Sequence, residues 1–169
     1  ENRLLVFTSV MGEDFRPAAP SNGAGDLAFS LAALAMLLDR LNLRVGNAAY
    51  TETNRTYGAT TLLKKHLSLD GGVLRLRFRA KGGKRVEHTL RDRRLLRIMQ
   101  EIHDLPGRHL FAYVNGEGEV TPVGSAHVNA YLAAATGVAG ATAKTFRTWG
   151  GTLAAFGLAR EARGTVTLK

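Results

Sequence analysis

Apolar residues near the start of the chain recur at the spacing of an α-helix. Such a stripe lies on one face of a helix and packs into a core. It consists of Leu27, Leu31, Leu34, Leu38 and Leu41. Asp26 is suited to cap the helix N-terminus, so we expect a helix from there to about Asn42. The preceding stretch, GEDFRPAAPSNGAG, is rich in Pro, Gly and Ala and predicts a loop.

The period then changes to that of β-strands, between Arg44 and Leu90. We expect strands at 60–69, 73–80 and 85–90, with the last two joined by a Gly-Gly hairpin in KGGK. Side chains alternate along a strand, so one face of 73–80 carries Leu74, Leu76 and Phe78. The other face is a row of cations: Arg75, Arg77, Arg79 and Lys81.

Helical spacing returns in the second half of the chain. Helices are expected at 91–103, at 125–136 with Ser125 as its cap and Gly137 closing it, and through 146–159 with Thr142 as its cap. A loop is expected at 114–120. We expect Trp149 to pack against the following helix. The fold class is therefore α+β, a mainly helical domain with a small antiparallel sheet. Residues 1–25 form an N-terminal segment, partly loop, and residues 26–169 the domain.

Composition and charge narrow the class of protein. At 169 residues and 45% hydrophobic residues, the chain can build one domain with a core, and no apolar run is long enough for a membrane span. The absence of cysteine excludes disulfides and cysteine zinc sites, and suits a reducing cytoplasm. The net charge of +9 favours a polyanionic partner, above all nucleic acid. The alternative on charge alone is a merely basic soluble protein.

Once metal, hydrolase and nucleotide sites are excluded, a few cationic side chains remain as candidate functional residues. The five histidines are scattered, so no metal is expected, and neither a G-x-S-x-G elbow nor a P-loop is present. Arg44 follows the long helix, Lys81 lies at the hairpin tip, and Arg147 lies in the first turns of the last helix. Each has an ordinary alternative: a helix C-terminal cation, a solvated turn residue and a surface ion-pair partner.

Taken in order, the motifs around these cations resemble the catalytic domain of type IB DNA topoisomerases, closest to the bacterial and poxvirus-like branch. The resemblance runs from about Leu37 to Leu153 and rests on RVGNAAYTETNRTYGATTLLKKHL, RFRAKGGK, DLPGRHLFAY, VNAYL and TAKTFRTWGGT. It implies a domain that binds duplex DNA as a monomer and, in the complete enzyme, relaxes supercoils through a 3′-phosphotyrosyl intermediate. The reaction needs no ATP, metal or other cofactor.

The resemblance also implies roles for individual residues. Arg44 in RVGN and Arg147 in KTFRTW would clamp the scissile phosphate, and Lys81 would protonate the leaving 5′-oxygen. The family usually has Gly where this chain has Ala80. Guanidinium forks suit this task because they bind two phosphate oxygens at once. The remaining expected DNA contacts are Lys64, Lys65, His66, Arg75, Arg77, Arg79, Lys84 and Lys144. For His66, a structural hydrogen bond is the alternative.

The chain departs from the family at its nucleophile. That tyrosine lies several tens of residues beyond the second arginine, whereas no tyrosine follows Arg147 here. We therefore expect an incomplete catalytic domain that binds DNA without cleaving it, located in the cytoplasm at the nucleoid.

Three alternatives remain. A tyrosine recombinase shares the Arg, Lys, Arg and Tyr plan but typically has H-x-x-R at the second arginine, where this chain has Lys144-x-x-Arg147. A DNA-binding module with no catalytic past would rest on charge alone, whereas the DNA-binding remnant without catalysis is the incomplete domain described above. An RNA-binding domain is disfavoured because no aromatic stacking pair is present.

Overall fold

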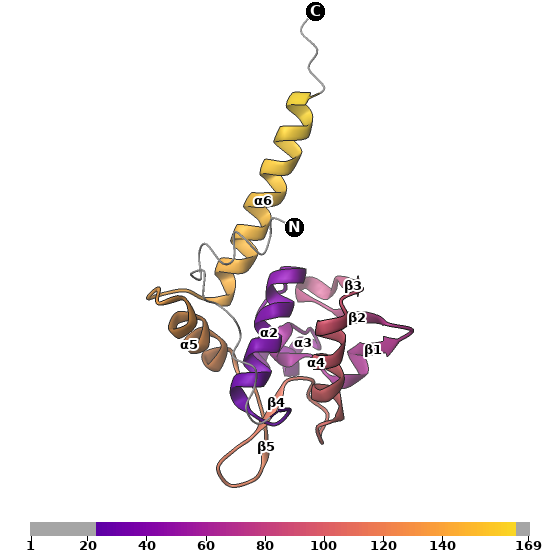
Figure 1. The fold of residues 1–169 in the computed structure, drawn as a ribbon, viewed down its shortest axis with the longest axis vertical. Helices are drawn as coiled ribbons and strands as arrows, with labels where there is room; N and C mark the ends of the chain where they lie inside the picture. Colours follow the sequence, from indigo (N-terminus) through magenta and orange to yellow (C-terminus); the bar gives the residue numbers. More distant parts are fainter. Residues whose placement is uncertain (1–22, 165–169) are drawn as a thin grey trace, which may run out of the picture.

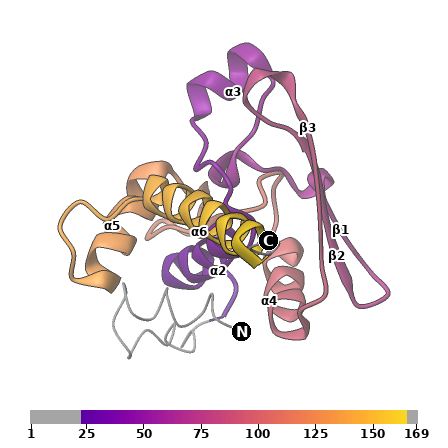
Figure 2. The same ribbon diagram turned by 90° about the horizontal axis from the view of Figure 1, so that it is seen from above.

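A single long helix lies at the centre of the molecule. The computed structural model describes residues 23–164, so most of the expected N-terminal segment and the last five residues lie outside the described part. Helix α2 (Leu27–Leu41) begins after Asp26, whose carboxylate accepts a hydrogen bond from Ala28 N at 3.0 Å. Helices α4, α5 and α6 all contact it, as Figure 2 shows from above. Because neighbours surround α2, its burial extends beyond the predicted stripe to Phe29, Ala33 and Leu37.

A three-stranded antiparallel sheet lies beside the helices, in the order β1 (Leu67–Asp70), β2 (Val73–Arg79) and β3 (Arg85–Leu90). The predicted alternation along β2 is confirmed. Leu74, Leu76 and Phe78 are buried, while Arg77 and Arg79 are exposed and Arg75 is half-buried.

The first predicted strand is wrong over most of its length. Residues Ala59–Thr61 and Lys64–His66 form 3₁₀ turns, and only Leu67–Asp70 pair with β2. The reason is tertiary: Lys64 N donates to Arg108 O at 3.0 Å, and Leu63 N donates to the His66 ring at 3.1 Å. These bonds replace a ladder with β2.

A short helix, α3 (Ala48–Asn54), was not predicted. It begins after Asn47, whose side chain accepts from Tyr50 N at 3.4 Å. None of its residues is buried. An apolar stripe therefore could not have revealed it.

The second half of the chain is helical as expected, with α4 (Arg93–Asp104), α5 (Ser125–Thr136) and α6 (Ala143–Gly164). The predicted loop at 114–120 is partly a hairpin, formed by β4 (Ala112–Val114) and β5 (Val120–Pro122). Ser125 does not cap α5, because the cap is Gly124, whose N–H donates to the His127 ring at 3.2 Å. Gly137 ends the helix with a φ of 65°, as expected.

Helix α6 projects away from the rest of the molecule (Figure 1). It runs as one helix without a turn after Trp149, so no following helix folds back onto that side chain within the described residues. The predicted burial of Trp149 is therefore wrong, since it is 43% exposed. Together, the helices and the two small sheets confirm the α+β class.

Candidate functional site

The three cations singled out in the sequence line one pocket. Arg44, Lys81 and Arg147 surround a space of about 320 Å³, together with Lys144. They come from a loop, a hairpin and a helix that are far apart in the sequence. The remaining lining is Leu43, Val45, Gly46, Asn47, Tyr50, Thr56, Tyr57, Gly58 and Ala143. The lining thus holds four cations and no carboxylate.

The Arg44 loop is fixed by its backbone. Ala59 N donates to Arg44 O at 2.8 Å, and Thr60 N donates to Val45 O at 2.7 Å. The loop also lies directly against Gly58, which is buried. Its main chain is therefore held while the Arg44 side chain stays exposed. An exposed guanidinium on a fixed backbone is available to a ligand.

Lys81 lies at the tip of the β2–β3 hairpin. Ala80 N donates to Lys84 O at 2.7 Å, and Gly82 and Gly83 take positive φ angles that close the turn. The Lys81 ammonium lies 5.9 Å from the centre of the Tyr50 ring on α3, within the range of a cation–π interaction. This contact joins the hairpin tip to α3, and both side chains line the pocket.

Arg147 is presented by the first two turns of α6. The start of this helix is anchored on α5, because Ala143 N donates to the Asn129 side chain at 3.1 Å. One turn beyond Arg147, Gly150 packs against the Asn42 side chain at the end of α2. These two contacts fix the direction of α6 and so the position of Arg147.

The pocket carries uncompensated positive charge. Within the described residues, the salt bridges join Arg40 to Asp92, Arg77 to Glu87 and His103 to Asp104, and none involves a pocket residue. Four like charges around one small space repel one another unless an anion binds between them. A phosphate diester matches both the charge and the geometry of guanidinium groups.

A broader groove of about 810 Å³ adjoins this pocket, and Tyr57 lines both. It brings together four expected DNA contacts, Lys65, His66, Arg77 and Arg79. Arg77 is already paired with Glu87, at 2.8 Å. Lys64, Arg75 and Lys84 line neither the pocket nor the groove.

The His66 ring makes the structural hydrogen bond that was weighed against a DNA contact. Its Nδ1 accepts from Leu63 N, and its ring packs edge-on against Tyr57 with centroids 4.3 Å apart. Burial, and then the charge of Lys65, lower the pKa of His66 below its ordinary value of 6.5. The ring is thus neutral at pH 7, and the accepting Nδ1 leaves the proton on Nε2.

Several residues of the pocket and groove were missed from the sequence. Tyr50 and Tyr57 line the pocket, and Arg55 and Arg85 line the groove. Tyr50 and Tyr57 stand within the quoted motif RVGNAAYTETNRTYG, which was the available clue. Arg85 faces Arg79 across the β2–β3 ladder, so the hairpin register could have placed it on the cationic face.

The described residues show neither a cluster of metal ligands nor a membrane-spanning helix. Within residues 23–164, no three His, Asp or Glu side chains gather closely enough to hold a metal ion. No helix in the described part of the chain has the length and apolar character needed to cross a bilayer.

Comparisons with known proteins agree with this geometry. The family model described as "Eukaryotic DNA topoisomerase I, catalytic core" matches residues 26–165. The "DNA topoisomerase 1B" of Acanthamoeba polyphaga mimivirus is 33% identical over 116 residues, which cover 66% of this chain and 34% of the viral protein. The chain thus spans about a third of that relative's length. Because the family match includes every cation of the pocket and most of the chain, the protein belongs to the type IB DNA topoisomerase family.

Proposed function

We propose that Arg44, Lys81 and Arg147 bind the scissile phosphate of duplex DNA, as part of the active site of a type IB topoisomerase. The observation that carries this proposal is the convergence of these three cations, with Lys144, on one pocket without a carboxylate. The family match and the name of the viral relative support DNA as the substrate.

The residue types suit phosphoryl transfer. That reaction depends mainly on positioning and on neutralising charge on the phosphate oxygens. Arg44 and Arg147 neutralise the non-bridging oxygens. When a tyrosine oxygen attacks phosphorus, the bond to the 5′-oxygen breaks, and Lys81 donates its proton to that leaving oxygen. General acid catalysis of this kind contributes about 10² to 10⁴ in rate.

The surrounding cations would hold the flanking DNA. Lys65, His66 and Arg79 line the groove, which shares Tyr57 with the pocket. The neutral His66 would donate its Nε2 proton to a phosphate oxygen. Lys64, Arg75 and Lys84 line neither the pocket nor the groove. They would attract the phosphate backbone of the flanking DNA at longer range, because sequence-independent affinity for DNA is mainly electrostatic.

We also propose that the protein acts as a monomer and is located at the nucleoid. All cations of the pocket come from one copy of the chain, so the phosphate site needs no second copy. The recombinase alternative is not favoured, since the matching family is that of topoisomerases and Lys144-x-x-Arg147 is retained.

Binding of a short duplex tests the phosphate site. The variant R44Q/R147Q should bind the duplex much more weakly than the wild-type chain, with a salt-dependence slope lower by about 2, as two lost phosphate contacts require. R108Q/R160Q removes two exposed arginines outside the pocket and groove and should leave binding nearly unchanged. Equal losses in both variants would argue against the pocket.

Relaxation of a supercoiled plasmid tests the catalytic part of the proposed function. No tyrosine follows Arg147 in the 169-residue sequence, so this polypeptide by itself should bind the plasmid without relaxing it. A covalent 3′-phosphotyrosyl adduct formed by this polypeptide would instead point to Tyr50 or Tyr57, the two tyrosines that line the pocket.

A further inference from the structure

Two neighbouring cross-strand pairs lie on the exposed face of the β2–β3 ladder. In the register of the two strands, Arg77 faces Glu87 and Arg79 faces Arg85. All four residues are exposed. Side chains two residues apart on a strand point to the same side of the sheet. One pair of opposite charges therefore lies next to one pair of like charges.

Only the first of these pairs is neutralised within the protein. Arg77 donates from Nε to Glu87 Oε1 at 2.9 Å, and its Nη2 lies 2.8 Å from the same oxygen. Among the described residues that line the groove, Glu87 is the only carboxylate. No salt bridge within residues 23–164 reaches Arg79 or Arg85. The second pair thus keeps both of its charges.

The placement of Arg79 opposite Arg85 is unfavourable for the hairpin itself. Directly opposed residues have Cβ atoms about 4.5–5.5 Å apart, and like charges at that position destabilise a sheet. The Arg79 guanidinium lies beside the turn, because a Cβ on Gly83 would be 3.6 Å from its Nη2. That turn adds the exposed Lys81 and Lys84. An anion bound at the two arginines would relieve this repulsion.

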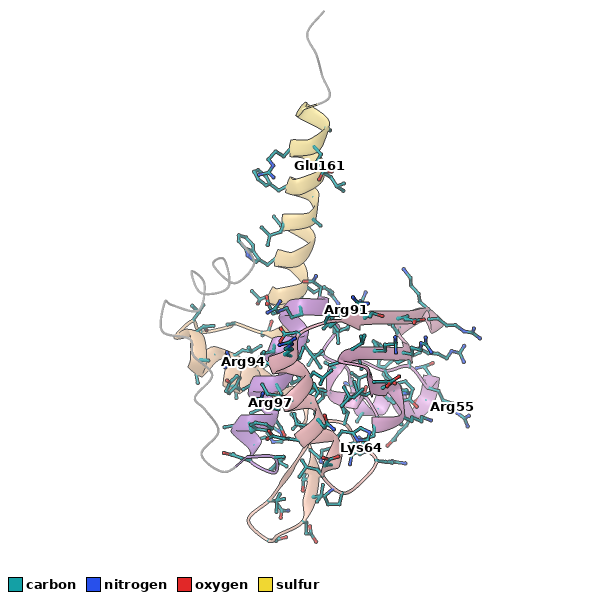
Figure 3. All side chains as sticks on the ribbon, turned by 45° about the vertical axis from the view of Figure 1, so that its right-hand side comes forward. Arg55, Lys64, Arg91, Arg94, Arg97 and Glu161 are labelled. Atoms are coloured by element: carbon teal, nitrogen blue, oxygen red, sulfur yellow. The ribbon has the colours of Figure 1, made fainter. Side chains whose placement is uncertain are left out.

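The position of the pair places it next to the proposed phosphate site. Arg79 and Arg85 both line the groove, and Arg79 precedes Lys81 by two residues. The end of β2 is held in place, because Tyr57 N donates to Arg79 O at 2.7 Å. In Figure 3, Arg55, which also lines the groove, lies on the side of the sheet, away from the labelled arginines of α4.

The chemistry of the pair selects its ligand. A guanidinium group has a planar fork of N–H donors that can bind two phosphate oxygens at once. Two such groups, presented side by side from neighbouring strands, offer donors and charge for the backbone of a nucleic acid strand. Arg77 is less available for this contact, because its donors already bind Glu87.

We propose that Arg79 and Arg85 form a clamp for the phosphate backbone of the DNA strand next to the scissile phosphate. This inference rests on the proposed function, because it takes the scissile phosphate to lie at Lys81. It adds Arg85 to the residues that bind DNA. It also separates the arginines of β2, since Arg79 binds the backbone while Glu87 neutralises Arg77.

Binding of a short duplex by the 169-residue protein, measured by fluorescence anisotropy over a salt series, tests the clamp. The variant R79Q/R85Q should bind about tenfold more weakly than the wild type, with a salt-dependence slope lower by about 2, since two phosphate contacts are lost. The variant R77Q/E87Q removes the neighbouring pair of the same ladder. It should lose much less affinity and keep the slope, because a cation and an anion disappear together.

R108Q/R160Q is the control for net charge, with the same change on exposed residues outside the groove. Its affinity should stay close to that of the wild type, and circular dichroism should show that all variants are folded. A loss in R79Q/R85Q no larger than in R108Q/R160Q, or an equal loss in R77Q/E87Q, would overturn the inference. Failure of the wild type to bind any duplex would instead refute the proposed function, and this inference with it.

The variant R85E gives a second, independent measurement. It converts the like-charge pair into one that matches Arg77 and Glu87. Without DNA, its melting temperature should rise by about 1–3 °C, because the repulsion at Arg79 is replaced by attraction. Its affinity for the duplex should nevertheless fall. An R85E protein that melts below the wild type, or that binds the duplex as tightly, would overturn the inference.

Discussion

Gly58 lies against Gly46 so closely that neither position has room for a side chain. A methyl group on Gly58 would lie 2.5 Å from Gly46 N and 2.7 Å from Arg44 O. Gly46 in turn has a φ of +93°, which side chains rarely adopt. This contact joins the segment after α3 to the loop that carries Arg44, and both glycines line the pocket.

Gly58→Ala should therefore disturb both stability and binding. The new methyl meets backbone atoms that cannot rotate away, and overpacking of this kind costs about 1–3 kcal/mol. Because the Arg44 loop must shift, affinity for a short duplex should fall as well. Chemical denaturation and fluorescence anisotropy measure the two effects. Gly116→Ala is the control, since a methyl there meets nothing within 4 Å. Its change should stay within about 0.5 kcal/mol.

Gly150→Ala and Gly151→Ala should act in opposite directions on α6. A methyl on Gly151 meets nothing within 4 Å, so the alanine should stabilise the helix by about 0.5–1 kcal/mol. A methyl on Gly150 would overlap the Asn42 side chain and should destabilise the protein. Adding Asn42→Gly to Gly150→Ala should recover stability, because residue 42 has a positive φ that glycine tolerates. Thermal unfolding of the four proteins is the measurement. No recovery in the double variant would contradict the contact.

Arg44→Lys and Arg44→Gln should separate charge from geometry. Lysine keeps the charge but loses the planar fork, so duplex affinity should fall while the salt-dependence slope stays unchanged. Glutamine should lower both the affinity and the slope, the latter by about 1. Anisotropy titrations over a salt series distinguish the two. A slope that is identical in all three proteins would show that Arg44 does not contact a phosphate.

Acidification should destabilise the protein as the pH falls below 6.5. Burial lowers the pKa values of His66, His88 and His109 from that value, with added contributions from Lys65 at His66 and Arg108 at His109. The unfolded chain then binds more protons than the folded one, so stability is full above pH 6.5 and is lost progressively as the pH falls toward the folded-state pKa values. Melting temperatures between pH 7.5 and 5 measure this loss.

His66→Asn should reduce that pH dependence. An asparagine oxygen can replace Nδ1 as the acceptor for Leu63 N and does not titrate. The variant should therefore lose less stability between pH 7.5 and 5 than the wild-type protein does. An unchanged pH profile would show that His66 does not contribute to it.

The elements with strong local patterns were predictable from the sequence. The leucine stripe and Asp26 predicted α2, and the alternation in VLRLRFRA predicted the cationic face of β2, because periodicity reflects which face is buried. Helix α3, the two 3₁₀ turns and the exposure of Trp149 were not predicted. The 3₁₀ turn at Lys64 depends on a partner distant in sequence, because Lys64 N donates to Arg108 O. Helix α3 and Trp149, by contrast, lack the buried contacts that a sequence pattern records.

The sequence by itself determined the family, the excess of positive charge and the identity of three cations in family motifs. Only the tertiary structure decided that Arg44, Lys81 and Arg147 line one pocket. It also decided that Tyr50 and Tyr57 line that pocket with them. The physical reason is that local patterns record which side of an element is buried. They do not record which elements meet, and here this depends on long-range contacts such as Gly58 on Gly46 and Gly150 on Asn42.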